Sequence, residues 1–234
     1  FRDHFSSMAD RFIQEFDLNQ ESFVLDIGSN DGVFLSPLKE NGIKILGVDP
    51  AENLVNLANS NGLETLHGYF DDKITDEIIA LKGRADIVTA FNVFAHADDL
   101  KSIPQNVFKV LKDSGIFIIE VQYLLDTIKD LTFDNIYHEH VNYWSVHTLQ
   151  FFFHSLDLQL VKVEHVNTHG GSIRAFISAK KESEIDSSVE DFIATEKQFG
   201  LDDFLTLKQF ASNVSDLKNT TKNKYIKSLL SCPT

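Results

Sequence analysis

Short runs rich in β-branched and aromatic residues alternate with segments of helical periodicity through the first half of the chain. A strand, a helix and a second strand in succession are typical of βαβ units, in which parallel strands form one sheet. The connections are right-handed, so helices should cover both faces of that sheet. We predict an α/β fold whose five parallel strands lie at 23–27, 43–48, 64–66, 86–91 and 116–121, with helices at 51–60, 72–81 and 99–111.

The alternation ends after the fifth run. Residues 158–167 and 172–180 are two more strand-like runs, and only residues 168–171 connect them. Because this connection is too short for a helix, the two runs should form an antiparallel hairpin. Five alternating strands and a terminal antiparallel pair are the strand order of a Rossmann-like class I methyltransferase sheet, which is the fold that we predict.

The last part of the sequence is polar and has helical periodicity. We expect residues 1–181 to form one methyltransferase domain, in which residues 1–20 are a leading helix. Residues 182–234 should form a helical extension, or a linker to a further domain.

Composition argues against several classes of partner. The 35 acidic and 21 basic side chains give a formal net charge of −14, which repels nucleic acid phosphates. No apolar run reaches the roughly 18 residues that span a bilayer, and the N-terminus lacks the apolar centre of a signal peptide. The single cysteine, Cys232, excludes an internal disulfide framework. We expect a cytoplasmic protein that binds small molecules, while the sequence leaves its oligomeric state open.

The stretch VLDIGSNDG at 24–32 indicates a buried strand, a glycine-containing turn and the start of a helix. Ligands bind at this edge of such a sheet, where the helix offers unpaired N–H groups. Gly28 and Gly32 allow the backbone to approach a ligand closely. Twenty-one positions after Gly28, Asp49 ends the second strand before Pro50, and a carboxylate there accepts hydrogen bonds from ribose hydroxyls. Together these features predict a cofactor of the adenosine type.

The side chains of the turn distinguish between two such cofactors. A dinucleotide requires the second glycine of GxGxxG, so that its pyrophosphate packs on the backbone. Here Ser29 and Asn30 place side chains at that point, and Asp31 would repel an anion. S-adenosylmethionine carries a sulfonium and an ammonium group, which suit the carboxylates of Asp26 and Asp31. We therefore predict S-adenosylmethionine rather than NAD; a tight turn without a ligand is the structural alternative.

Two further loops leave the same edge of the sheet. Tyr69 and Phe70 follow the third strand and could place an aromatic ring beside the adenine. Asn92 and His96 follow the fourth strand, where the methionine end of the cofactor should lie. Tyr69 and Phe94 would suit the hydrophobic core equally well. The predicted cofactor residues are Asp26, Gly28, Ser29, Asn30, Asp31, Gly32, Asp49, Pro50, Tyr69, Phe70, Asn92 and His96.

The stretch IYHEHVNYWS at 136–145 concentrates titratable side chains after the fifth strand. A zinc site would need three or four ligands, and His138 and His140 point to one face of an extended segment. No third ligand has suitable spacing, because His147 and His154 fall on an expected helix. We therefore predict no metal site. An acid/base site and a hydrogen-bonded structural corner both fit the residues, and the place on the cofactor side of the sheet favours the first.

Four motifs, LDIGSNDG, FNVFAHADDL, IYHEHVNYWS and THGGSIR, resemble in this order those of S-adenosylmethionine-dependent C-methyltransferases of deoxysugar biosynthesis, over about residues 20–180. Such enzymes place a methyl group on C3 of nucleotide-linked 4-keto-hexoses. The resemblance implies that His140 is the catalytic base, and that Tyr137 and Glu139 assist it or hold the sugar. It also implies a cysteine-rich zinc-binding module and a further C-terminal domain. This sequence contains neither, so we expect a fragment or a reduced relative.

The glycine turn and its arginine are the second half of the implied site. Glycines can bring backbone N–H groups close to a sugar or a phosphate, and arginine binds phosphate through two parallel hydrogen bonds. The residues alone favour an ordinary glycine turn with positive φ, whereas the resemblance favours a substrate role. The implied substrate-binding residues are His138, His169, Gly170, Gly171, Ser172 and Arg174.

The implied chemistry suits these residue types. Carbon becomes nucleophilic once a proton α to a carbonyl is removed, and the ordinary pKa of histidine suits proton abstraction near neutral pH. A neighbouring carboxylate can fix the imidazole tautomer, and a phenol can hydrogen-bond an enolate oxygen. The predicted activity is methyl transfer from S-adenosylmethionine to the carbon α to the ketone of a nucleotide-linked 4-keto-deoxysugar. The alternatives are a NAD(P)-dependent Rossmann oxidoreductase and a non-catalytic cofactor-binding module.

Overall fold

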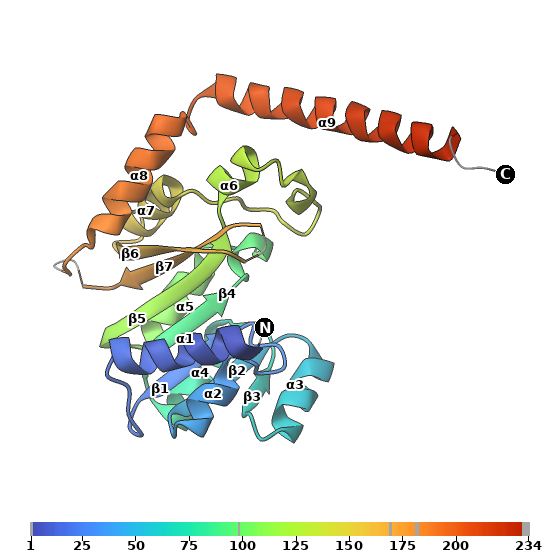
Figure 1. The fold of residues 1–234 in the computed structure, drawn as a ribbon. Helices are drawn as coiled ribbons and strands as arrows, with labels where there is room; N and C mark the ends of the chain where they lie inside the picture. Colours follow the sequence, from blue (N-terminus) through green and yellow to red (C-terminus); the bar gives the residue numbers. More distant parts are fainter. Residues whose placement is uncertain (1, 98, 169, 181–182, 231–234) are drawn as a thin grey trace.

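A computed structural model of the chain describes residues 2–97, 99–168, 170–180 and 183–230. Its centre is one sheet made of β1 (Phe23–Ile27), β2 (Lys44–Asp49), β3 (Thr65–His67), β4 (Ala85–Phe91), β5 (Leu111–Gln122), β6 (Gln159–Val166) and β7 (Ser172–Ser178). The strand order is β3-β2-β1-β4-β5-β7-β6 (Figure 1). The first five strands are parallel, and β7 runs antiparallel to both β5 and β6.

Helices cover both faces of the sheet (Figure 1). They are α1 (Arg2–Glu15), α2 (Leu35–Glu40), α3 (Glu52–Ser60), α4 (Asp72–Lys82), α5 (Ser102–Val110), α6 (Leu124–Lys129), α7 (Val146–His154), α8 (Ser187–Phe199) and α9 (Phe204–Leu230), with the short 3₁₀ helices η1 (Phe94–His96) and η2 (Phe133–Asn135). One hydrophobic cluster joins the sheet to α1, α2 and α3, and a second joins it to α4 through α8.

The strands carry the burial pattern of a sheet that is covered on both sides. β1 is buried at every position, which is typical of a parallel strand with helices on either face. In β7, Ile173 and Ala175 face one hydrophobic cluster and Phe176 faces the other. The chain runs from β1 outward to β3 and then returns to β4 on the other side of β1. Ligands bind beyond the carboxyl ends of the strands at such a reversal.

Local signals set where several helices begin and end. Asp71 accepts a hydrogen bond from the N–H of Ile74 at the start of α4. Ser145 and Thr148 form a capping box at the start of α7. Gly200 adopts the left-handed conformation that ends α8. The sequence therefore specifies these boundaries through single side chains as well as through periodicity.

The predicted α/β class I methyltransferase fold is confirmed, including the terminal hairpin and the C-terminal helices. Most predicted strands are displaced by no more than one or two residues. The exception is β5, which begins at Leu111 and not at residue 116. The sequence pattern assigns Leu111 to a helix, whereas the residue pairs with Ala85 of β4, so strand pairing begins as soon as α5 ends.

The C-terminal helices differ in how they meet the rest of the chain. α8 packs against β6 and α7, whereas α9 extends away from the sheet over much of its length (Figure 1). In the described part of the chain no helix, α9 included, is both long enough and apolar enough to cross a bilayer.

Candidate active site

The turn after β1 is shaped by its glycines and by one asparagine. Gly28 has a φ of +69°, and a Cβ atom there would lie 2.7 Å from Cγ2 of Val93, which follows β4. Asn30 also has a positive φ, of 50°, which asparagine tolerates better than most residues. The N–H of Gly28 donates to the carbonyl of Val48 at 2.8 Å. The turn is thereby held between the ends of β2 and β4, where the sequence predicts the cofactor.

Asp49 lies beside this turn, as its place at the end of β2 predicts. It is buried, and its two carboxylate oxygens accept hydrogen bonds from the N–H groups of Asn30 at 2.9 Å and Ala51 at 2.8 Å. Each oxygen has a second lone pair, so the carboxylate can still accept bonds from ribose hydroxyls. Pro50 contributes its carbonyl to His67, whose Nε2 lies 3.0 Å away.

Asp26 points into the sheet between β1 and β4. Its Oδ1 accepts a hydrogen bond from Oγ1 of Thr89 at 2.6 Å. Burial raises the pKa of the Asp26 carboxyl to about 7, the hydrogen bond from Thr89 opposes this rise, and the charge of Asp49 adds to it. A positively charged ligand nearby would favour the ionised form of Asp26.

These residues fit a cofactor that carries a ribose and positive charge. The groups around the turn are the carboxylates of Asp26, Asp31 and Asp49 together with backbone that can be approached closely at Gly28. Three acidic side chains suit a sulfonium and an ammonium group, and they disfavour the pyrophosphate of a dinucleotide. The chemistry of the donor set therefore agrees with S-adenosylmethionine.

The aromatic residues after β3 and β4 divide between core and surface. Tyr69 is 78% exposed and remains available to a ligand, whereas Phe70 packs in the hydrophobic cluster with Ile74. The prediction that Phe70 contacts the cofactor is therefore not supported, because its ring is already covered. Phe94, which the sequence left open, is fully buried. Asn92, at the end of β4, has a φ of +58°, a strained conformation that is common at binding sites.

The histidine segment, residues 136–145, presents Nε2 of His140 as a hydrogen-bond acceptor. Nδ1 of His140 lies 2.8 Å from the carbonyl oxygen of Asn135, and Nε2 lies 3.2 Å from the hydroxyl of Tyr137. A carbonyl can only accept a hydrogen bond, so we assign the proton of neutral His140 to Nδ1. The lone pair on Nε2 is then free to accept the Tyr137 proton, or a proton from a substrate.

The same segment is fastened to η1 at the end of β4. The N–H of Val141 donates to the carbonyl of Ala95 at 2.9 Å, and Nδ2 of Asn142 donates to the carbonyl of Ala97 at 2.9 Å. His96 donates from Nδ1 to the carbonyl of Glu139 at 3.0 Å, and its ring centre lies 4.9 Å from that of His140. His96, predicted as a cofactor residue, thus joins the cofactor edge to the histidine segment.

Glu139 and His138 point away from the His140 ring nitrogens and remain exposed, so both stay available to a substrate. Their side chains are 60% and 87% exposed, and the nearest charged atoms of the pair are 3.8 Å apart. The sequence suggests that a neighbouring carboxylate fixes the tautomer of His140, whereas in the structure the carbonyl of Asn135 contacts Nδ1 of that ring. Among the described residues, no group of three His, Cys, Asp or Glu side chains is arranged to hold a metal ion.

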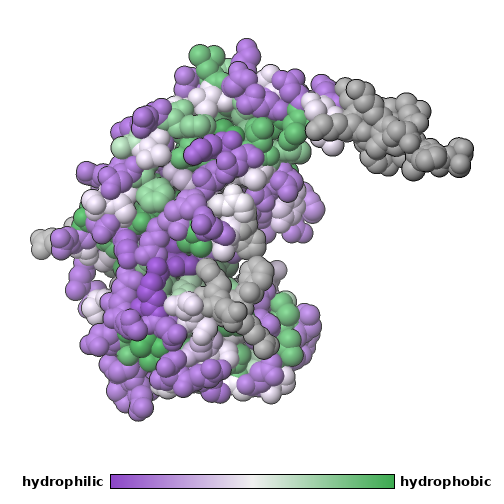
Figure 2. Space-filling model, viewed as in Figure 1, coloured by the Kyte–Doolittle hydropathy of each residue, from purple (hydrophilic) through white to green (hydrophobic). Residues whose placement is uncertain are grey.

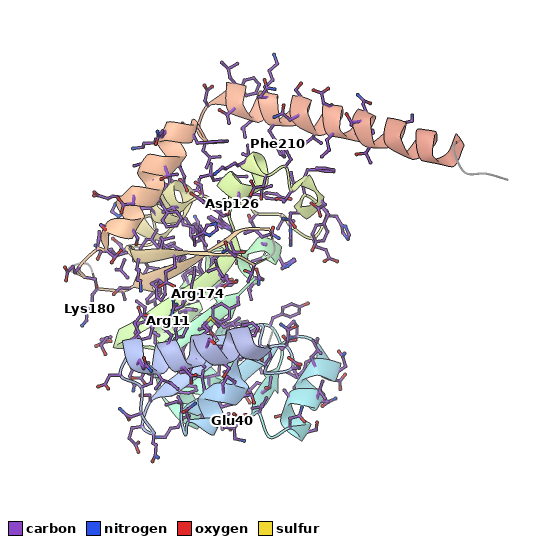
Figure 3. The ribbon with its side chains drawn as sticks, viewed as in Figure 1. Arg11, Glu40, Asp126, Arg174, Lys180 and Phe210 are labelled. Carbon is purple, nitrogen blue, oxygen red and sulfur yellow. The ribbon has the colours of Figure 1, made fainter. Side chains whose placement is uncertain are left out.

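Arg174 is committed to an ion pair inside the protein. Its Nη2 lies 2.8 Å from Oε2 of Glu120, and both side chains are buried. Its guanidinium also lies over the rings of Phe12 and Phe91, between the sheet and α1 (Figure 3). The prediction that Arg174 binds a phosphate is therefore wrong for this structure, because the charge is already paired and covered. Sequence spacing gave no sign of Glu120, which lies on a different strand.

Charged side chains continue this network onto the surface. Arg11 of α1 lies 2.7 Å from Glu164 of β6, and Lys162 lies 2.6 Å from Glu15. Figure 2 shows a hydrophilic band between α1 and β6 on this face of the molecule. Exposed pairs of this kind contribute little each, but they join α1 to the hairpin that carries Arg174.

The hairpin turn between β6 and β7, which contains Gly170 and Gly171, packs against the loop that carries Asn135. A Cβ atom on Gly170 would lie 3.3 Å from Cγ2 of Thr132 and 3.5 Å from Nδ2 of Asn135, and one on Gly171 would overlap Asp126. Ser172 is fully buried and donates to the carbonyl of Thr168, which does not support a substrate role for it. His169 lies outside the described residues. Gly170 and Gly171 also line a cavity of about 290 Å³.

The buried ion pair predicts a specific effect on stability. Arg174→Met should lower the free energy of unfolding by about 3–5 kcal/mol, because it leaves the Glu120 carboxylate buried without its partner. Adding Glu120→Gln should restore part of the loss, and urea denaturation measures both. Unchanged stability with weaker substrate binding would instead identify Arg174 as a ligand residue.

The raised pKa of Asp26 predicts how stability depends on pH. Its folded value of about 7 lies above the unfolded value of about 3.9. The stabilisation from protonated Asp26 is therefore complete below the unfolded value and is lost as pH rises through about 7. Asp26→Asn keeps an acceptor for Thr89 but does not titrate. In urea denaturation, the free energy of unfolding of Asp26→Asn should rise relative to that of the parent as pH increases from about 4 to about 7. Parallel pH profiles would contradict this assignment.

Two family models cover most of the chain. Residues 1–163 match a methyltransferase domain, and residues 167–230 match a C-methyltransferase C-terminal domain. The C-methyltransferase NovU of Streptomyces niveus is 33% identical over 209 residues, which are 89% of this chain and 50% of that relative. A ubiquinone biosynthesis O-methyltransferase of Hydrogenovibrio crunogenus is 27% identical over 44% of each chain. The chain spans about half the length of the relatives that it matches.

Solved structures share the fold at low sequence identity. A magnesium protoporphyrin IX methyltransferase from Synechocystis, solved with bound SAH, aligns with a TM-score of 0.59 at 12% identity and covers 76% of this chain and 83% of its own. A SAM-dependent methyltransferase from Archaeoglobus fulgidus aligns with a TM-score of 0.56 at 19% identity, covering 75% and 94%. At these identities the likeness concerns the fold.

Proposed function

Since the chain belongs to the methyltransferase-domain family, with a second region that matches C-methyltransferases, we propose that it transfers a methyl group to carbon. The acceptor is the carbon α to the ketone of a nucleotide-linked 4-keto-deoxysugar, activated as an enolate. The observation that carries this proposal is the contact of His140 Nδ1 with the Asn135 carbonyl, from which we assign Nε2 as a proton acceptor beside the phenol of Tyr137. The resemblance of IYHEHVNYWS and THGGSIR to deoxysugar enzymes supports the choice of substrate.

S-adenosylmethionine is the cofactor, and when bound it supplies an electrophilic methyl group. Asp49 would hold its ribose, and the acidic residues Asp26 and Asp31 would favour its positive charges. Tyr69 is exposed beside the carboxyl end of β3, where it would cover the adenine. The residues of the chain then have two tasks, which are to place the acceptor carbon and to remove its proton.

His140 performs the proton abstraction in this account. The Asn135 carbonyl holds the Nδ1 proton, so Nε2 accepts the α-proton of the substrate and the resulting imidazolium keeps its hydrogen bond. Tyr137 lies within reach of the same nitrogen and can turn its hydroxyl to the enolate oxygen, where a donor stabilises developing charge. His96 packs beside His140 and helps to orient it.

The alternatives have less support. The three carboxylates beside the turn disfavour the pyrophosphate of a nicotinamide cofactor, and the family matches concern methyltransferases. Oxygen methylation, as in the ubiquinone relatives, is disfavoured because residues 167–230 match a C-methyltransferase C-terminal domain, whereas those relatives align with only 39–52% of this chain. A non-catalytic module would bind the cofactor without turnover, which a methyl-transfer assay distinguishes.

Replacing the base separates binding from chemistry. His140→Asn should leave the fold and cofactor affinity unchanged, because asparagine keeps a polar end of similar reach. Methyl transfer should fall by roughly 10²–10⁴-fold, the range that general-base catalysis supplies. Exchange of the substrate's C3 hydrogen with deuterated water should fall with it, since that exchange reports proton abstraction alone. Tyr137→Phe should cost less, because the base remains.

The matched control is His154→Asn, at the exposed end of α7, which should retain parental activity. If His140→Asn exchanges the C3 hydrogen at the parental rate, the base lies elsewhere and the histidine segment is structural.

Removing the ribose acceptor tests the cofactor assignment. Asp49→Ala should weaken S-adenosylmethionine binding by about 1.5–3 kcal/mol, the scale of hydrogen bonds to a charged group. The substitution also frees the N–H groups of Asn30 and Ala51, so circular dichroism should verify the fold. Titration calorimetry that finds unchanged affinity in a folded variant would exclude Asp49 from the ribose site.

A further inference from the structure

A cavity of about 310 Å³ lies between α6 and α9, outside the segments that carry the predicted site residues. Two aromatic rings, of Phe199 and Phe210, line it together with Lys129, Gln209 and Asn213. In Figure 3, Phe210 points from α9 toward α6. Aromatic walls beside carboxamides and one ammonium group are suited to a nucleoside that carries phosphate, and the volume is at the lower end of the range of ligand pockets.

The proposed substrate needs a cation that the predicted site does not provide. A nucleotide-linked sugar carries a diphosphate, while the chain as a whole has a net charge of −14. Arg174 is excluded, because its guanidinium is buried against Glu120. Within the described residues, Lys129 forms no ion pair, so its ammonium group is available to an anion.

The cavity and the base belong to one hydrogen-bonded unit. The N–H of Thr132 donates to the carbonyl of Thr127 at 3.2 Å, which ties the loop after α6 to the last turn of that helix. The N–H of Asn135 donates to the carbonyl of Thr132 at 3.1 Å, and the carbonyl of Asn135 holds Nδ1 of His140. Lys129, in that last turn, is therefore separated from the base by only a short, ordered loop.

The polar side chains of α9 are arranged to read the edge of a base. Nε2 of Gln209 donates to Oδ1 of Asn213 at 2.8 Å. This bond leaves the Gln209 carbonyl as an acceptor and the Asn213 amide hydrogens as donors, one turn apart on the same face of α9. A base that stacks on Phe210 would meet both groups, and stacking on an aromatic ring adds affinity for any base.

We propose that the cavity between α6 and α9 binds the nucleoside diphosphate part of the substrate. The base lies at Phe199 and Phe210, the diphosphate lies at Lys129, and the sugar extends along residues 130–135 toward His140. The proposal rests on the proposed function for the identity of the substrate. It places the nucleoside diphosphate between α6 and α9, and it places the sugar beside His140.

The test measures nucleotide binding without methyl transfer. The 5′-diphosphates of uridine, thymidine, guanosine and adenosine are titrated into the full chain by calorimetry at about 0.15 M salt, which screens distant charges. We expect at least one to bind, and Lys129→Ala to weaken its binding about tenfold or more, as loss of a charge-assisted bond does. Phe210→Ala should weaken binding of the diphosphate and of the free nucleoside alike. Lys129→Arg should restore most of the affinity.

The matched control is Lys208→Ala, a lysine of α9 that does not line the cavity, which should bind the diphosphate as the parent does. If none of the four binds, or if binding ignores Lys129 and Phe210, the cavity is not the nucleotide site. The probes have no ketone, so their binding is independent of His140. Methyl transfer with an unchanged KM in Lys129→Ala would overturn this site while leaving the proposed function intact, and nucleotide binding without methyl transfer would do the reverse.

Discussion

Glu120, near the carboxyl end of β5, holds three separate segments of the chain. Its carboxylate accepts hydrogen bonds from Arg174 on β7 at 2.8 Å and from Thr168 in the hairpin turn at 3.0 Å. Its carbonyl accepts a bond from the N–H of Asn92 at 2.8 Å. A buried carboxylate is tolerated only when it is paired and hydrogen-bonded, so these contacts are required of the fold. They fix the antiparallel hairpin and the end of β4 relative to the parallel sheet.

The position of the hairpin determines the position of the candidate base. Its turn approaches α6 so closely that a Cβ atom on Gly171 would overlap Asp126, and one on Gly170 would crowd Cγ2 of Thr132 at 3.3 Å in the loop after α6. The carbonyl of Asn135 in turn fixes the proton of His140. The glycine motif and the histidine motif, which are separate in the sequence, therefore form one structural unit, and the glycines serve packing before they serve any ligand.

The sequence predicts those features that depend on neighbouring residues. Periodicity was enough to predict the sheet, and the βα arrangement was enough to predict that the turn at Gly28 lies beside Asp49 at the carboxyl edge of the sheet. The partners of Arg174 could not be predicted, since Glu120 and Glu164 lie on other strands and only strand pairing brings them together. The Asn135 carbonyl could not be predicted either, because a backbone group has no sequence signature. The contact of His96 with His140 required the packing of two loops.

The central claim is that the acceptor atom is carbon, which is supported by the match of residues 167–230 to a C-methyltransferase C-terminal domain and by a histidine that can form an enolate. Incubation with S-adenosylmethionine carrying a ¹³C-labelled methyl group, together with a panel of nucleotide 4-ketosugars, tests it by NMR. The account predicts that the label appears in a methyl group bonded to carbon, with loss of the hydrogen next to the ketone. A labelled methyl group bonded to oxygen would contradict it.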